Sequence, residues 1–344
     1  MTSAPPTSPR APRARRRVGM RLRATAVAVA AALGVSAVLT GCDLRVETPD
    51  PTPLVPDAAE QLRDRSAIQA ADLAGAARAA ATTAPEAAVP VLAEIAVTSQ
   101  QHVDALGGVY DPFPGVTPAP TPTATATADP PPPADAAGVL AALRSGADTA
   151  RADAVAEEDA AMAHLLAGIA LNRALLADRL AVALGEDPAE LPTVVVPTAL
   201  PAGLDAQAAA VLVQSEDAAG LAWEVVAGRA TDEARTRAAE RAALHRERAE
   251  AWAEAAGFAG TGTDPRRAAY DLPEAITGDG LAPEVTSSAL SGIDSGLGEA
   301  YAALVPVVGP QDRPALLDAA LEAMLRATRL GADVPVLPGM PTSA

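Results

Sequence analysis

The chain of 344 residues has no lysine, one cysteine, two tryptophans, three tyrosines and two phenylalanines. A single cysteine excludes an internal disulfide, a paired-cysteine redox motif and a metal site built from several thiolates. The scarcity of alternating Val, Ile, Tyr and Phe argues against a β core, because strands favour β-branched and aromatic residues. We therefore expect the fold to be stabilised by packed helices.

The chain also has fewer basic than acidic residues. The chain has 26 arginines against 43 acidic residues, a formal net charge of −17. Seven of the arginines lie between Arg10 and Arg23, so the remainder of the chain carries a formal charge of about −24 by the same count. Phosphate backbones and anionic lipid headgroups repel such a surface. We expect no nucleic-acid partner, and we expect any membrane attachment to depend on acyl chains.

The N-terminal region has the pattern of an export signal. The basic stretch is followed by an uncharged, Ala- and Val-rich run over 24–39 and then by Leu39-Thr40-Gly41-Cys42. The apolar run is shorter than the ~20 residues that a membrane span needs. The tetrapeptide resembles the lipobox of bacterial lipoproteins, in which the cysteine thiol receives a diacylglycerol and becomes the mature N-terminus. The alternative is an ordinary signal peptide followed by a chance cysteine.

The lipobox resemblance implies a location and a modification. It predicts a signal peptide over 1–41, lipidation (diacylglycerol and palmitate) at Cys42, and anchoring to the extracytoplasmic face of the cell membrane. Residues 42–56 contain four prolines and are predicted to form a stiff tether. Apart from the covalent lipid, we expect no cofactor.

Beyond the tether, apolar residues recur at helical spacing, which predicts an all-α fold. A Pro/Thr-rich loop over 112–133 contains too little apolar surface to form a core. The predicted helices span about 57–81, 85–106, 135–184 with a break near Gly146, 204–228, 232–257, 284–305 and 312–331.

The two halves of the chain share one plan. Residues 57–187 and 204–341 both show two helices, a long loop and two more helices, and a proline-spaced linker over 188–203 separates them. This arrangement predicts two four-helix bundles that arose by divergent duplication.

The second half resembles the ferritin-like domain of actinobacterial lipoproteins, a family of unknown function. The resemblance covers about 204–341 and implies a ferritin-like bundle without an established reaction; the first half is assigned the same fold through the duplication. The matching motifs are Ser215-Glu216-Asp217-Ala218-Ala219, Trp223-Glu224-Val225-Val226, Ala268-Ala269-Tyr270-Asp271-Leu272-Pro273, Glu299-Ala300-Tyr301-Ala302-Ala303-Leu304-Val305 and Leu337-Pro338-Gly339-Met340-Pro341.

The di-iron site of ferritin-like proteins is not expected here. Such a site takes Glu-x-x-His from each of two helices, and none of His102, His164 and His245 has a glutamate three residues before it. A weaker alternative remains, because Glu216, His245 and Asp294 each lie on a core-facing stripe and could hold Zn, Mn or Fe(II) together.

The competing interpretation of Glu216, His245 and Asp294 is structural and is the one we favour. They would form a buried polar cluster, or would be flank residues paired with Arg241, Arg248 or Arg326. Glu322 is the only glutamate of the last helix that could join them, and it is predicted to lie off the apolar stripe of that helix. Trp223 and Trp252 occupy apolar helical positions and are predicted to lie in the core.

No catalytic residue is predicted. The sequence has neither a Gly-x-Ser-x-Gly nucleophile motif nor a glycine-rich phosphate loop. We therefore expect a non-enzymatic lipoprotein with a binding, scaffolding or envelope role. The alternative is a metal-binding ferritin-like protein with redox or storage activity. The sequence identifies no protein partner.

Overall fold

All regular structure in the described residues, 52–115, 135–278 and 283–341 of the computed structural model, is helical. This confirms the predicted all-α class. The predicted signal peptide (1–41), Cys42 and most of the tether (42–56) lie outside the described residues, as does most of the predicted loop over 112–133.

Eight long helices account for most of the described residues, and short helical turns lie between some of them. The short turns are η1 (Glu86–Ala88), α7 (Glu274–Thr277) and η2 (Val305–Val307). The long helices are α1 (Ala58–Ala80), α2 (Val89–Ala105), α3 (Ala136–Ala156), α4 (Ala160–Ala183), α5 (Ala206–Arg229), α6 (Asp232–Ala255), α8 (Pro283–Ala302) and α9 (Arg313–Arg329).

Aspartate caps set the start of four of these helices. The carboxylates of Asp57, Asp135, Asp159 and Asp205 each accept a hydrogen bond from the backbone N–H three residues later, at 2.7–2.8 Å. An N-cap side chain satisfies a backbone donor that has no partner inside the helix, and its carboxylate interacts favourably with the helix dipole. These starts agree with the predicted ones to within a residue or two, except that of α4.

The start of α4 corrects the predicted break near Gly146. Gly146 lies inside α3, and the chain leaves the helix at Glu157 and restarts after the Asp159 cap. Glycine serves another purpose at position 146. A Cβ there would lie 3.2 Å from Nη1 of the buried Arg173, which donates to the Gly146 carbonyl at 3.1 Å. The glycine admits a side chain of α4 and does not end α3.

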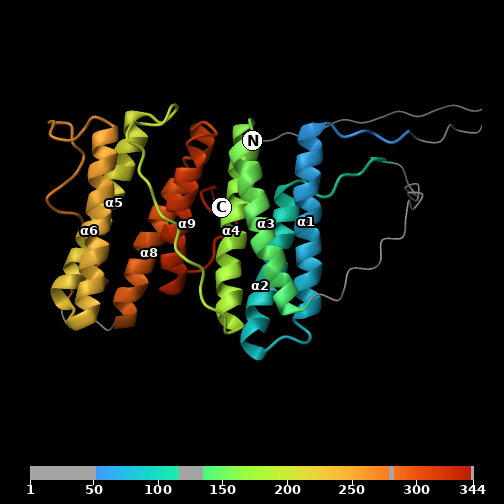
Figure 1. Ribbon diagram of the computed structural model, residues 1–344, viewed down its shortest axis with the longest axis horizontal. Coiled ribbons are helices and arrows are strands. Elements are labelled where there is room, and N and C mark those ends of the chain that lie inside the picture. Colours follow the sequence, from blue (N-terminus) through green and yellow to red (C-terminus); the bar gives the residue numbers. More distant parts are fainter. Residues whose placement is uncertain (1–51, 116–134, 279–282, 342–344) are drawn as a thin grey trace, which may run out of the picture. The chain divides into compact units, whose positions relative to one another are not determined.

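The helices pack as antiparallel hairpins. α1 packs with α2, α3 with α4, α5 with α6, and α8 with α9 (Figure 1). Within the first half, α1 also contacts α3 and α2 contacts α4, and within the second half α5 contacts α8. The connection between α4 and α5 has no helix, and its residues Leu191, Val194, Val196 and Leu200 pack against the core.

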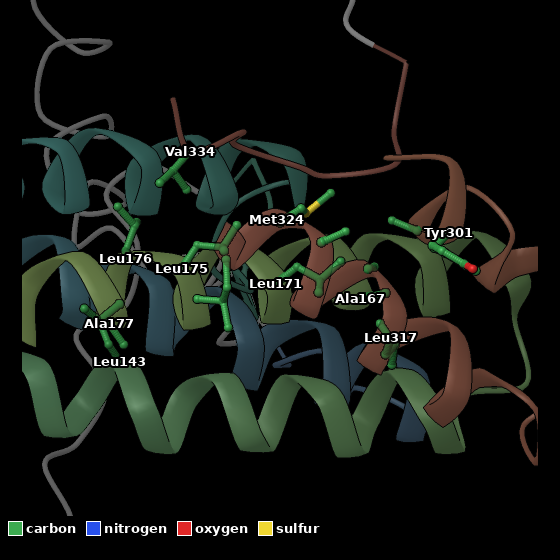
Figure 2. Packing of buried hydrophobic residues seen from close by; sticks show 14 of the residues in the cluster. Leu143, Ala167, Leu171, Leu175, Leu176, Ala177, Tyr301, Leu317, Met324 and Val334 are labelled. Carbon is green, nitrogen blue, oxygen red and sulfur yellow. The ribbon is translucent and has the colours of Figure 1, made fainter. Parts of the chain in front are cut away.

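The hydrophobic core is continuous between the two halves. α4 contacts α9 and η2, and Figure 2 shows Leu171 and Leu175 of α4 near Met324 of α9. Arg313, at the start of α9, is 3% exposed and donates to the carbonyl oxygens of Ala154 and Glu157 at the end of α3, at 2.9 and 2.5 Å. The two halves therefore share buried surface.

The segment after α9 lies across both halves. His102 of α2 is hydrogen-bonded through Nε2 to the Val336 carbonyl at 2.9 Å, and Asn172 of α4 donates to the Pro335 carbonyl at 2.7 Å. Gly339 has φ +81°, and a Cβ there would lie 2.6–2.7 Å from atoms of Ala302 and Ala303. Only glycine fits this contact, because any side chain would clash with the end of α8.

Among the described helices, only α4 is long and apolar enough to cross a membrane by length and composition. Of its most apolar window, 72% is buried inside the protein. A helix that is apolar on all sides is expected at the centre of a large core, and this is where α4 lies.

Candidate functional site

The second half contains a buried network of polar side chains. Glu216 comes from α5, His245 from α6, Asp294 and Tyr301 from α8, and Glu322 from α9, and each is at most 1% exposed. Five polar side chains in one core are unusual, because burying a polar group is unfavourable unless it is paired. The structure thus brings together Glu216, His245 and Asp294, the three residues proposed from the sequence as possible metal ligands.

Glu216 is at the centre of a chain of short hydrogen bonds. Its Oε2 lies 2.6 Å from His245 Nδ1, and its Oε1 accepts a hydrogen bond of 2.5 Å from the Tyr301 hydroxyl. The Tyr301 oxygen in turn accepts from Trp252 Nε1 at 3.0 Å. Both carboxylate oxygens of Glu216 are therefore satisfied by neighbouring helices, and Trp252 is in the core as predicted, at 2% exposure.

Asp294 lies on the other side of the imidazole. Its Oδ1 is 3.8 Å from His245 Nε2 and 3.7 Å from Arg241 Nη2, both beyond hydrogen-bond distance. Neither Asp294 oxygen, nor His245 Nε2, has a hydrogen-bond partner among the described residues. The imidazole thus separates the two acids, with Glu216 at Nδ1 and Asp294 facing Nε2.

Glu322 is the anionic centre of a second cluster next to Asp294. It accepts hydrogen bonds from Arg241 at 2.8 Å, from Arg248 at 3.0 Å and from Arg326. Arg241 and Arg248 are each 5% exposed. Glu322 lies off the apolar stripe of α9 as predicted, but it is buried all the same, at 1% exposure. Almost the whole circumference of α9 is covered, so an apolar stripe does not define its buried face.

The sequence of α6 already indicated that another helix must supply a buried carboxylate, the role that Glu322 fills. Arg241, His245 and Arg248 are spaced at i, i+4 and i+7, so they project from one face of the helix. Since Ala242 and Ala249 place that side of α6 in the core, its two arginines need a buried carboxylate on another helix. Glu322 is the only glutamate in α9.

The pKa values follow from burial and from the arginines. Burial raises the pKa of Asp294 and, together with the neighbouring Glu216, raises that of Tyr301 well above its usual value. Burial also acts to raise the pKa of Glu322, but Arg241, Arg248 and Arg326 outweigh it and lower the pKa to about 2. Tyr301 therefore remains a hydrogen-bond donor at neutral pH, and Glu322 remains a carboxylate.

This arrangement fits a metal ion poorly. Within the described ranges, no group of three or more His, Cys, Asp or Glu side chains is arranged to hold one. Glu216 and Asp294 approach different ring nitrogens of His245, so the three cannot ligate one ion without rearrangement. The guanidinium of Arg241, close to Asp294, also disfavours an added cation.

A pocket of about 800 Å³ adjoins the arginine cluster. Arg241 and Arg326 contribute to both, and α5, α6, α7, α8 and α9 all supply lining residues. Trp223, predicted to be a core residue, is only partly buried and lines this pocket. The pocket was not foreseen from the sequence, since its walls come from elements far apart in the chain.

Comparison with known proteins finds a match for one region of the chain, in its second half. The model of a domain of unknown function, DUF4439, matches residues 206–342, which include the polar network and the pocket. The match agrees with the prediction that the second half belongs to a family of unknown function. No curated protein and no solved structure matches the chain.

Proposed function

We propose that the protein is a non-enzymatic lipoprotein with a binding or scaffolding role, held at the extracytoplasmic face of the cell membrane by a diacylglycerol on Cys42. One observation carries the non-enzymatic, metal-independent part of this proposal. The carboxylate of Glu322 is already bound by three arginines, and Arg241 also lies 3.7 Å from Asp294. A carboxylate with three guanidinium partners needs no metal to balance its charge.

The proposal includes a ferritin-like four-helix bundle in each half. The pairing of two helical hairpins in both halves supports it. So does a similarity between two contacts, one in each half, which use different donor atoms of a tyrosine. Asp64 of α1 accepts from the Tyr110 backbone N–H at 2.7 Å, and Asp217 of α5 accepts from the Tyr270 hydroxyl at 2.7 Å. In both cases an aspartate of the first helix holds the tyrosine-containing segment that follows the second.

A second function has one observation in its favour. His245 Nε2 and both oxygens of Asp294 lack partners among the described residues, and they face each other. If side chains shifted so that Glu216 also reached the gap, one imidazole and two carboxylates would suit Zn, Mn or Fe(II). This is the metal-binding alternative, with redox or storage activity.

Elemental analysis of the purified protein separates the two functions. We expect much less than one Fe, Mn or Zn per chain, with no change in the His245→Ala variant. His164→Ala is the matched control, because His164 lies in α4 of the other half. About one metal ion per chain, lost in His245→Ala and retained in His164→Ala, would overturn the non-enzymatic proposal and support the alternative.

A further inference from the structure

A well-formed pocket lies beside the arginine cluster in the second half. Its volume of about 800 Å³ falls within the ~300–1,000 Å³ range of small-molecule sites. One side is apolar, formed by Trp223, Val226, Ile276, Leu290 and Leu330. Ile276 and Leu290 belong to a small hydrophobic cluster of the second half, so this wall is anchored in packed structure.

All the charged residues of the described lining are cationic. Arg229, Arg237, Arg241 and Arg326 line the pocket, and no aspartate or glutamate does so among the described residues. Four arginines in one pocket are unexpected on a chain with a net charge of −17. They give the described part of the lining a positive formal charge.

The contacts of these arginines leave positive charge facing the pocket. Arg229 donates to the carbonyl oxygens of Ile276 and Gly278, at 2.5 and 2.6 Å, and these neutral partners do not compensate its charge. Arg237 pairs with Glu233, but the two side chains are 64% and 84% exposed, and an ion pair of this kind is weak.

The arginine cluster behind the pocket adds to this surplus. Arg241, Arg248 and Arg326 all pair with the carboxylate of Glu322, and Arg241 also lies 3.7 Å from Asp294, so three arginines face two acids. The side chain of Arg326 is 31% exposed, and among the described residues its only hydrogen bond is through Nε. Its two terminal nitrogens remain as donors for an anion at the edge of the pocket.

We propose that this pocket binds an amphipathic carboxylate, with its apolar body against Trp223 and Leu290 and its carboxylate on Arg326 and Arg237. Planar guanidinium groups match carboxylate geometry, and an apolar wall next to them selects for a ligand that has both parts. This inference rests on the proposed binding role and names its ligand class.

Calorimetric titration with dodecanoate tests the proposal. The full-length Cys42→Ser chain is used, because it carries no acyl group that would compete for the pocket. We expect one dodecanoate per chain. Dodecanol has the same tail without the charge, and dodecyltrimethylammonium has the opposite charge, so both should bind at least about tenfold more weakly. Equal binding of the three amphiphiles, or no saturable binding of dodecanoate, would overturn the proposal.

Two pairs of variants locate the site. Arg237→Gln should weaken dodecanoate binding by about fivefold, as expected for one partly solvated charge. Arg144→Gln removes another exposed arginine (53%, against 64% for Arg237), which is paired with Glu186 in the other half, and should have no effect. Ala234→Trp, at an exposed lining position, should block the pocket, whereas Ala243→Trp on an exposed position of α6 outside it should not. Unchanged affinity in Ala234→Trp refutes this location.

The outcome is separable from that of the proposed function. A chain that contains no metal and binds no dodecanoate refutes the pocket proposal and leaves the non-enzymatic role standing. A stoichiometric metal ion that depends on His245 refutes the proposed function, whichever amphiphile the pocket binds.

Discussion

Replacing Glu322 by glutamine tests whether the buried charge cluster is balanced by this one carboxylate. The variant keeps the size of the side chain and removes the charge that holds Arg241, Arg248 and Arg326. Two of these guanidinium groups are 5% exposed, so they cannot turn to solvent without disturbing the core. Breaking a buried ion pair from one side typically costs about 3–5 kcal/mol, because the remaining charge is left unpaired.

The pKa of Glu322 leads to a similar magnitude. The folded protein lowers it from the ordinary 4.5 to about 2. A difference of this size corresponds to roughly 3 kcal/mol of preferential stabilisation of the carboxylate, at 1.36 kcal/mol per pKa unit. We therefore expect Glu322→Gln to lower the free energy of unfolding at pH 7 by about 3–5 kcal/mol.

Urea unfolding followed by far-ultraviolet circular dichroism measures this loss. Because the folded pKa lies below the unfolded one, the stabilisation is fully present above about pH 5 and is lost as the pH falls toward 2. The difference between the wild-type chain and Glu322→Gln should therefore shrink over that interval. Glu233→Gln, which breaks the exposed pair with Arg237, should change stability little. A loss below about 1 kcal/mol at pH 7, or a difference that does not depend on pH, would show that Glu322 does not balance the cluster.

Two further predictions concern the ends of the protein. Cys42→Ser should abolish acyl attachment and block lipoprotein processing, since serine supplies no thiolate for the thioether. Metabolic labelling with radioactive palmitate measures the attachment. Label on the variant would refute the lipobox assignment. Gly339→Ala should lower the melting temperature, because the added Cβ would lie 2.6–2.7 Å from atoms of Ala302 and Ala303 at a residue with φ +81°. Gly262→Ala, where a Cβ meets nothing within 4 Å, is its control, and equal melting temperatures would contradict the described contact.

Local patterns in the sequence were sufficient to predict the positions of most helices. Apolar residues at helical spacing placed most helix boundaries close to where they are found. They failed at Gly146, where a glycine taken as a helix end admits the side chain of Arg173 from α4. A contact between residues 27 positions apart leaves no trace in local propensity.

The residues of the candidate site were likewise predicted only in part from the sequence. Glu216, His245 and Asp294 could be selected because each lies on a core-facing stripe of its own helix, and periodicity is a property of one helix. Glu322 was placed outside the core, because the stripe rule assumes that a helix is covered on one side only. Trp223 was predicted to be a core residue, but whether it lines a pocket depends on the surfaces of the neighbouring helices.

The sequence by itself determined the all-α class, the positions of most helices and the burial of Glu216, His245 and Asp294, because each of these depends on spacing within one segment. Only the tertiary structure decided which charges meet. Glu216 binds Tyr301 and His245, Glu322 gathers three arginines, and a cationic pocket forms on a strongly acidic chain. These contacts depend on the packing of helices that are distant in sequence, where low dielectric and the cost of an unpaired buried charge select the partners.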